Sequence, residues 1–157
     1  MMRVRADMND VNLHYFLRPD HHDAGRIWAA TSAMVAPDTE FDDRRDWLFN
    51  EIEDLHDRGA RTICALDART GHLRGFVTVD PETKRLHQMV VAPEALGSGL
   101  ARVLLGEARD MAPARIEVAV SRANARALRF FEREGFRRLG ETTNATGDDA
   151  VLMEWRA

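Results

Sequence analysis

Gly97, Ser98 and Gly99 lie between two apolar segments, VVAPEAL before them and LARVLL after them. This order predicts a strand that turns directly into a helix. The first backbone N–H groups of a helix have no partner within it and point outward along the positive end of the helix dipole. Glycines at that point let an anion approach the main chain without meeting a Cβ, so the turn could hold a phosphate. Close packing of neighbouring backbone is the other interpretation, and G-x-G alone does not distinguish the two.

The turn differs from the two common glycine-rich nucleotide motifs. Gly97 and Gly99 supply G-x-G, but Arg102 occupies the place of the third glycine in the dinucleotide fingerprint. The P-loop pattern G-x-x-x-x-G-K-[ST] does not occur in the chain. Neither motif therefore identifies a ligand for this turn.

Apolar periodicity on both sides of the turn predicts the elements that would position it. Apolar runs predict strands over residues 11–19, 61–68, 72–80, 85–91, 114–120, 136–143 and 150–157. Helical spacing predicts helices between Asp20 and Pro37, over 42–56, over 100–111 and over 123–134. Together they predict a mixed α/β domain whose central sheet has about six to seven strands, flanked by about four helices.

Composition limits the classes of function. The chain has 157 residues, of which 45% are hydrophobic and 31% charged, and we expect one globular domain over residues 1–157. A formal net charge of −4 argues against nucleic acid as the main partner. No segment has the length and apolarity to span a bilayer, and the N-terminus lacks a signal-peptide pattern. We therefore expect a cytoplasmic protein that does not bind membranes.

Cys64 and the segment from His21 to Asp23 have ordinary structural explanations. Cys64 is the single cysteine, so no disulfide forms within the chain, and its apolar surroundings predict a small buried side chain. His21, His22 and Asp23 are adjacent at the start of a predicted helix, where neighbouring side chains diverge. Because no further ligand clusters with them, we expect no metal site.

The glycine turn belongs to a longer pattern. V-x-P-E-x-x-G-x-G-x-A-x-x-L-L begins at Val91, and N-x-x-A-x-x-F-F-x-x-x-G-F follows from Asn124. Over residues 86–136, these motifs resemble the GNAT superfamily of acyl-CoA N-acyltransferases. The segment from Leu96 to Ala101 is similar to the family's pyrophosphate motif, [RQ]-x-x-G-x-[GA]. The resemblance implies the GNAT fold, in which a splayed pair of strands holds the cofactor, and acetyl-CoA as the acyl donor.

The resemblance also implies which residues hold acetyl-CoA. They are Met89, Val90, Val91, Leu96, Gly97, Ser98, Gly99, Leu100, Ala101, Asn124, Ala127, Phe130, Phe131 and Arg133. The strand residues would line the pantetheine arm, and the amides of the turn would hold the pyrophosphate. Leu96 replaces the family's Arg or Gln and removes a side-chain donor, which costs about 1.5–3 kcal/mol at most. Arg102 or Arg133 could supply compensating charge, and solvated helix surface is the alternative for both.

The implied reaction is attack of an amine on the acyl thioester, which needs a base for the amine proton and a donor for the oxyanion. By family position, the backbone amide of Val90 is the donor. His87 is the first candidate base, because an imidazole suits proton removal directly or through water. A structural polar residue at the sheet edge is the alternative for His87. Glu117 is the second candidate base, and Ser121 could order a water.

Phe131 stands where many relatives carry a Tyr that protonates the departing thiolate. A phenyl ring cannot donate a proton, and Tyr15, the single tyrosine, belongs to the first predicted strand. The thiol of CoA is a tolerable leaving group at neutral pH, so a dedicated acid is not required.

The acceptor is the least determined part of the reaction. In family members the region between the first two helices shapes the acceptor pocket, and Trp28, Met34, Phe41 and Trp47 could contribute to it. Acidic residues within 40–46 could attract a cationic amine or simply form a solvated helix start. We expect acetyl transfer to the primary amine of a small-molecule or amino-acid-like acceptor. The alternatives are a protein or aminoacyl-tRNA acceptor and a non-catalytic acyl-CoA sensor. A homodimer, common in the family, could form by sheet extension through residues 150–157.

Overall fold

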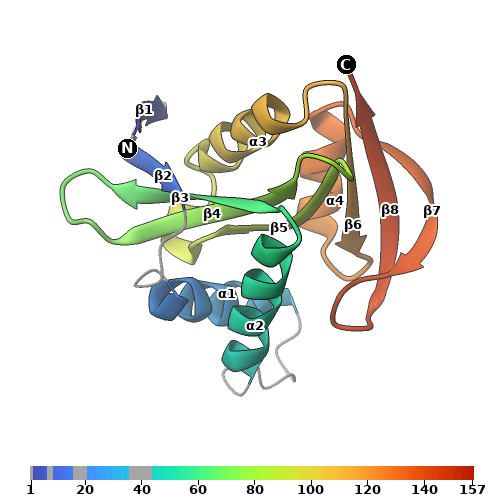
Figure 1. The fold of residues 1–157 in the computed structure, drawn as a ribbon, viewed down its shortest axis with the longest axis horizontal. Helices are drawn as coiled ribbons and strands as arrows, with labels where there is room; N and C mark the ends of the chain where they lie inside the picture. The colour runs from blue at the N-terminus through green and yellow to red at the C-terminus, as the bar shows by residue number, and fades with distance from the viewer. Residues whose placement is uncertain (1, 7–8, 16–20, 36–43) are drawn as a thin grey trace.

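The computed structural model describes residues 2–6, 9–15, 21–35 and 44–157. Its helices and strands, in chain order, are β1 (Met2–Ala6), β2 (Asn9–Tyr15), α1 (His21–Val35), α2 (Arg45–Asp57), β3 (Arg61–Asp67), β4 (Leu73–Asp80), β5 (Arg85–Val91), α3 (Leu100–Met111), β6 (Arg115–Ser121), α4 (Ala125–Arg133), β7 (Arg137–Thr143) and β8 (Asp149–Arg156). A single turn of 3₁₀ helix, Pro93–Ala95, precedes the glycine turn. Figure 1 shows these elements arranged around one twisted sheet.

The described strands form one eight-stranded sheet in the order β1-β2-β3-β4-β5-β6-β8-β7. Neighbouring strands are antiparallel except β5 and β6, which are parallel. The mixed α/β fold predicted from the sequence is confirmed, and strand β1 is an addition to it. β1 pairs with β2 from Met2↔Leu13 to Ala6↔Asn9. The sequence pattern missed β1 because MRVRA is short and alternates with arginines.

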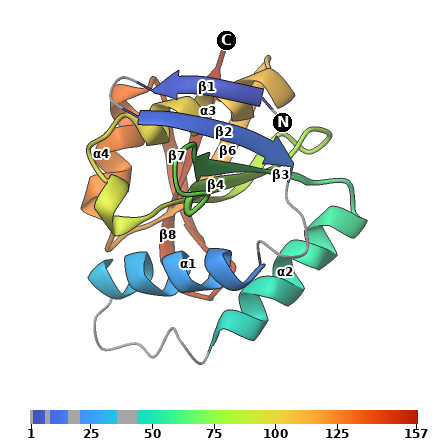
Figure 2. The same ribbon diagram turned by 90° about the vertical axis from the view of Figure 1, so that its left-hand side faces the viewer.

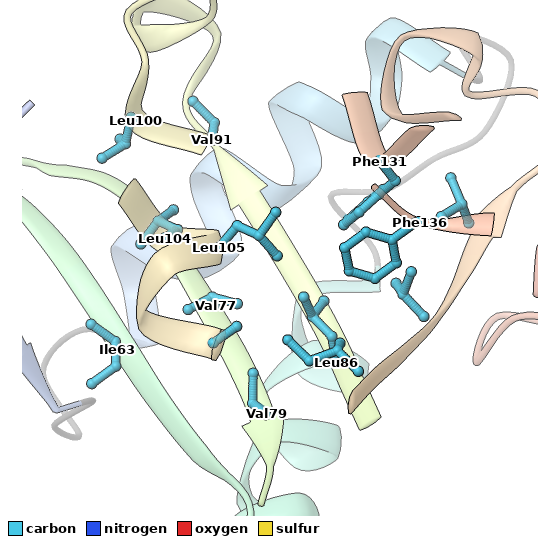
Figure 3. Packing of buried hydrophobic residues seen from close by; sticks show 14 of the residues in the cluster. Ile63, Val77, Val79, Leu86, Val91, Leu100, Leu104, Leu105, Phe131 and Phe136 are labelled. Carbon is cyan, nitrogen blue, oxygen red and sulfur yellow. The ribbon is translucent and has the colours of Figure 1, made fainter. Parts of the chain in front are cut away.

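Two apolar clusters hold the helices on opposite faces of the sheet. One cluster joins α3 and α4 to the sheet and includes Leu104 and Leu86, as Figure 3 shows. The other joins α1 and α2 to the opposite face and includes Ile27 and Val90. Figure 2 shows α1 and α2 together on one side of the strands. Because Leu86 and Val90 belong to different clusters, β5 is covered on both faces.

Helix ends follow local signals where the structure describes them. The Oδ1 of Asn124 accepts the Ala127 N–H at 3.1 Å and caps α4, and Gly135 ends that helix with a φ of 93°. Asp20 and Pro37, between which the sequence predicted the first helix, lie outside the described residues.

A bulge in β5 begins the separation of β5 from β6. Thr78 pairs with Gln88 and Val79 pairs with Leu86, so His87 is an extra residue with no partner on β4. On the other side, β5 pairs with β6 through only two positions, at Arg85 and Leu86. Beyond the bulge the two parallel strands have no further pairing, which is the splayed pair that the family resemblance implied.

Strand β8 is an interior strand of the sheet. It pairs with β6 over Ala150–Arg156 on one side and with β7 over Asp149–Glu154 on the other. Over residues 150–154 both edges of β8 are already hydrogen-bonded, so this part of the segment expected to extend a sheet across a dimer interface has no free edge for it.

Candidate active site

The divergence of β5 and β6 leaves a cavity of about 260 Å³ between them, the inter-strand cavity. Residues 86–90 of β5 and 118–121 of β6 form two of its walls. Its other lining residues are Trp28, Thr31, Ser32, Val35, Trp47, Asn124, Ala127, Phe131, Asn144, Ala145, Thr146 and Asp148. Three helices and the β7–β8 loop thus meet the two strands at one space.

Alternate residues of β5 present their backbone groups to this opening. Ala92 donates its N–H to the carbonyl of Arg74, the residue before Gly75 in β4, at 2.8 Å. In an antiparallel ladder, every second residue bonds toward the same neighbouring strand. Val90 therefore bonds toward β4, whereas the amide of Met89 points toward β6. The Val90 N–H, which was expected to donate to the oxyanion, therefore faces β4 and not the cavity. The Met89 N–H faces the cavity.

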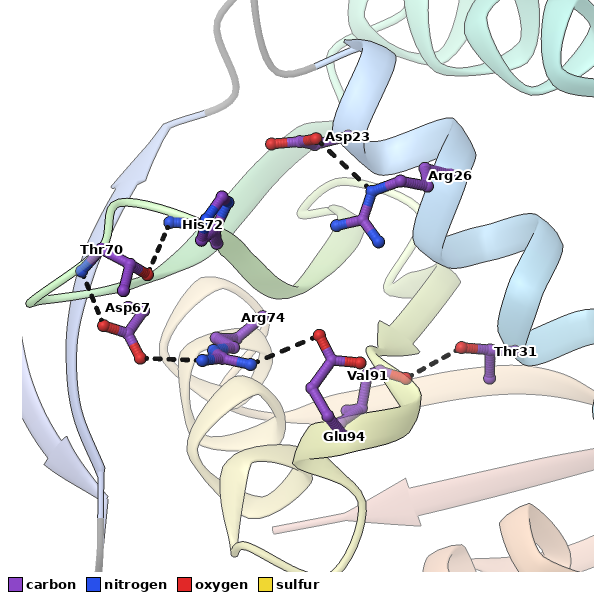
Figure 4. Close-up of polar contacts among 9 residues, drawn as sticks. All are labelled: Asp23, Arg26, Thr31, Asp67, Thr70, His72, Arg74, Val91 and Glu94. Carbon is purple, nitrogen blue, oxygen red and sulfur yellow. Dashed lines mark hydrogen bonds and ion pairs between the residues drawn. The ribbon is translucent and has the colours of Figure 1, made fainter.

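Two contacts support that direction. A Cβ built on Gly75 would lie 2.7 Å from the Val90 carbonyl oxygen, so this carbonyl points at β4. The carbonyl of Val91 points the other way and accepts a hydrogen bond from the Thr31 hydroxyl at 3.0 Å, as Figure 4 shows. α1 thus contacts β5 on the side where the cavity opens.

His87, the bulged residue, lines the inter-strand cavity and keeps contact with solvent. Desolvation by the surrounding protein lowers the pKa of His87 below its ordinary value of 6.5, and the positive charges of Arg85 and Arg58 lower it further. The carboxylate of Asp80 raises this pKa, by less than Arg85 lowers it and by more than Arg58 does. A lowered pKa keeps the imidazole neutral at neutral pH, the form that accepts a proton.

The structure separates the other two polar residues that the sequence proposed for chemistry. Ser121 lines the inter-strand cavity at the end of β6. Glu117 lies outside the lining, opposite Arg85 where β5 and β6 still pair. Its carboxylate contacts Arg115 at 2.5 Å. His87 and Ser121 therefore line the same cavity from its two strand walls, and Glu117 does not join them.

A second cavity, of about 450 Å³, opens beside the glycine turn. The lining residues of this glycine-turn cavity are Val91, Ala95, Leu96, Gly97, Gly99, Leu100, Ala101, Arg102, Arg126, Phe130, Arg133 and Glu134. Val90 and Val91 are adjacent and line one cavity each. The two spaces therefore follow each other along β5.

The glycine turn leaves several amides available. Gly97 and Gly99 adopt φ values of 81° and 90°, which other residues rarely reach. Among the described residues, the amides of Gly97, Gly99, Ala101 and Arg102 have no hydrogen-bond acceptor. Ser98 differs, because its amide donates to the Ala95 carbonyl at 3.2 Å and its hydroxyl accepts the Leu100 N–H at 3.4 Å. Of the turn residues predicted to bind phosphate, Ser98 thus has its amide and hydroxyl already hydrogen-bonded within the turn.

Three arginines surround this cavity. Arg102 is held by Glu134 at 3.2 Å, and Arg133 lines the same space from the end of α4. Arg126, in the first turn of α4, was not predicted as part of the site, because nothing in its local sequence points to the turn. With three arginines against the single carboxylate of Glu134, the wall of this cavity has a net positive charge.

The two phenylalanines of α4 divide between the cavities. Phe131 is 5% exposed and lines the inter-strand cavity with Asn124 and Ala127. Phe130 lines the glycine-turn cavity. Asn124 caps α4 and also lines the inter-strand cavity.

Part of the expected acceptor region reaches the inter-strand cavity. Trp28 and Trp47 line it with their ring centroids 5.8 Å apart. Met34 is 59% exposed and lies outside the lining, and Phe41 lies outside the described residues.

Two further parts of the wall were missed by the sequence-based prediction. The β7–β8 loop contributes Asp148, whose carboxylate accepts the Thr146 hydroxyl at 2.8 Å. Gln88 has a buried Oε1 that no donor of the described residues reaches. A buried amide oxygen without a donor is rare, and here it lies in the wall of a cavity.

Across residues 2–6, 9–15, 21–35 and 44–157, no group of three or more His, Cys, Asp or Glu side chains is placed to hold a metal ion. Of the helices in these ranges, none has the length and apolarity needed to cross a membrane.

Comparison with known proteins now identifies the family. The model of the acetyltransferase (GNAT) family matches residues 16–136. The protein therefore belongs to the GNAT acetyltransferases and is an acyltransferase. No curated protein matches the chain.

Solved structures share the fold across nearly the whole chain. A GNAT-family protein from Desulfovibrio desulfuricans is 25% identical with a TM-score of 0.71, over 93% of this chain and 98% of that one. The PaiA N-acetyltransferase of Thermoplasma acidophilum, in complex with coenzyme A, is 18% identical with a TM-score of 0.72, over 94% and 99%. A spermidine N-acetyltransferase chimera based on Vibrio cholerae SpeG is 24% identical with a TM-score of 0.64, over 93% and 94%.

Proposed function

We propose that this protein is a cytoplasmic enzyme that transfers an acetyl group from acetyl-CoA to the primary amine of a small molecule, with residues 1–157 as one catalytic domain. The observation that carries the proposal is the division of charge between two adjacent cavities. The glycine-turn cavity has three arginines against one glutamate, as an anion requires. The described lining of the inter-strand cavity has no Lys or Arg and one carboxylate, Asp148, as a cationic amine requires.

The residues present fit the donor at both ends. Free amides at the start of α3 suit a pyrophosphate, because they donate along the positive end of the helix dipole. The exposed backbone of Met89 suits the amides of a pantetheine arm, which can pair with it as another strand would. The same fold binds coenzyme A in the PaiA N-acetyltransferase, which supports this assignment.

We assign the chemical roles to two residues of β5. His87 accepts a proton from the ammonium or amine, directly or through a water, and the nitrogen attacks the thioester carbon. The Met89 N–H stabilises the developing oxyanion, a contribution on the order of 100-fold or more in rate. The new C–N bond forms, the C–S bond breaks, and the thiolate takes its proton from water.

The acceptor side suits a small cationic amine. Trp28 and Trp47 offer aromatic surface that attracts a cation, and Asp148 adds a negative charge to the lining of the same cavity. The unpartnered oxygen of Gln88 can accept a hydrogen bond from the amine. The fold shared with a spermidine N-acetyltransferase supports an amine acceptor.

One observation favours a second candidate, a non-catalytic acyl-CoA sensor. Phe131 lies at the inter-strand cavity where it offers no hydroxyl to protonate a thiolate. A sensor that binds acetyl-CoA without releasing the thiol needs no such hydroxyl, so Phe131 is compatible with that function as well.

Titration calorimetry with acetyl-CoA, followed by thiol release with a panel of diamines, amino acids and lysine peptides, separates the candidates. We expect saturable binding and thiol release with at least one small amine. Binding without release on any amine would favour the sensor. No binding of acetyl-CoA would contradict both.

A further inference from the structure

Leu96 is apolar, so the glycine motif itself supplies no charged side chain to an anion at the turn. Leu96 lines the glycine-turn cavity and packs against the core cluster beneath it. Its side chain has no hydrogen-bond donor, so this position contributes packing and no charge. An anion at the turn therefore needs a cation from another element.

Arg126 comes from such an element. Its Nη2 lies 4.0 Å from the position that a Cβ on Gly97 would occupy. The guanidinium thus extends from α4 across to the face of the turn where Gly97 has no side chain. Among the described residues Arg126 has no ion pair or hydrogen-bond acceptor.

The other two arginines of the cavity are less suited to this position. Arg102 contacts Glu134 at 3.2 Å, and the same carboxylate also contacts Arg109 at 3.3 Å. Arg133 lies two helical turns beyond Arg126 on α4, about 10 Å farther along the axis. Arg126 is therefore the one arginine of the cavity that the structure places within 4 Å of the open side of Gly97, and it has no ion pair among the described residues.

We propose that Arg126 binds the pyrophosphate of the CoA donor and takes over the side-chain contact that Leu96 cannot make. This inference rests on the proposed function, since it assumes a CoA-type donor. A phosphate above the turn would receive the backbone amides from one side and the planar guanidinium from the other. Arginine suits this role because its fork of N–H donors matches two phosphate oxygens at once.

Titration calorimetry of Arg126→Ala tests the proposal, with Arg129→Ala as the matched control. Arg129 is an exposed residue of the same helix that lines neither cavity, so both variants remove one positive charge from α4. We expect Arg126→Ala to bind CoA on the order of tenfold more weakly and Arg129→Ala to bind it within about twofold of the parent. The affinity loss of Arg126→Ala should be the same with dephospho-CoA, which keeps the pyrophosphate and lacks the 3′-phosphate.

Restoring a cation at position 96 gives a second test. In the Arg126→Ala background, Leu96→Arg should recover most of the lost CoA affinity. A folded double variant that binds no better than Arg126→Ala would contradict the exchange of roles.

Three further results would overturn the inference, and one of them also overturns the proposed function. Equal affinities of Arg126→Ala and Arg129→Ala would remove Arg126 from the site. A loss seen with CoA and absent with dephospho-CoA would assign Arg126 to the 3′-phosphate. Failure of the parent protein to bind CoA would contradict the proposed function itself.

Discussion

Phe130 and Phe131 are consecutive residues of α4 with ring centroids 5.2 Å apart, and each lines a different cavity. Consecutive helical side chains point about 100° apart, so α4 presents one ring to each space. Phe131 is held edge-on by Phe136 as well, at 5.0 Å. α4 is therefore the shared wall between the candidate donor and acceptor sites.

Phe131→Tyr should raise kcat a few-fold, because a hydroxyl at this wall could protonate the departing thiolate. CoA affinity should stay within about twofold, since the ring itself is unchanged. Phe136→Tyr is the control, because Phe136 is buried and lines neither cavity. Thiol release and calorimetry measure the two quantities. An unchanged kcat in Phe131→Tyr would show that loss of the thiolate does not limit the rate.

His87 should determine the acid side of the pH–rate profile. Only the neutral imidazole accepts a proton, so kcat/KM falls as pH decreases through the pKa of His87. Because desolvation and then Arg85 lower that pKa, the midpoint should lie below 6.5. His87→Gln should lower kcat about 100-fold and remove this limb while leaving CoA affinity unchanged.

The exposed His72, outside both cavities, provides the control for this profile. His72→Gln should leave the profile as it is. Arg85→Gln removes a positive charge and should move the midpoint upward. A profile in His87→Gln that keeps the parent's acid limb would exclude His87 as the base.

Gly75→Ala should destabilise the protein and slow catalysis together. The new Cβ would lie 2.7 Å from the Val90 carbonyl and 3.1 Å from the Leu104 side chain, so β5 must shift. Overpacking of this kind costs about 1–3 kcal/mol in the free energy of unfolding. A shift of β5 also displaces the Met89 amide, so kcat should fall. Denaturant unfolding and steady-state thiol release measure both effects.

Gly106→Ala is the control for Gly75→Ala, because the added methyl group would not be crowded there. Apart from the neighbouring backbone of α3 itself, no atom lies within 4 Å of a Cβ at Gly106, which sits inside this helix. This variant should gain about 0.5–1 kcal/mol in the free energy of unfolding, because alanine favours a helix over glycine. Equal stabilities for the two variants would contradict the packing at Gly75.

Asp148→Asn should weaken use of cationic amines. It removes the one carboxylate in the described lining of the inter-strand cavity and keeps an oxygen for the Thr146 hydroxyl. Because the group is exposed, kcat/KM for a diamine should fall only about three- to tenfold. CoA affinity should not change. Asp149→Asn, next to it and outside the lining, is the control, and an equal loss there would point to general charge.

The sequence predicted best where its signals were local. The Asn124 cap and the glycine turn could be predicted because each depends on the conformation of a few adjacent residues. The order of elements followed from apolar periodicity, apart from β1. The amide direction at Met89 could not be predicted, since it depends on the register of β5 against β4 and on the bulge at His87.

By itself, the sequence determined the class of protein, a GNAT-type fold with a turn suited to an anion. Its motifs are local patterns of residue type, so they can be recognised without knowing which residues meet in the folded protein. Only the tertiary structure decided which residues share a cavity. It excluded Glu117 from the inter-strand cavity, added Asp148 and Gln88, and brought Arg126 to Gly97. These relationships depend on how strands register and how α4 docks beside the turn, contacts between residues far apart in the chain.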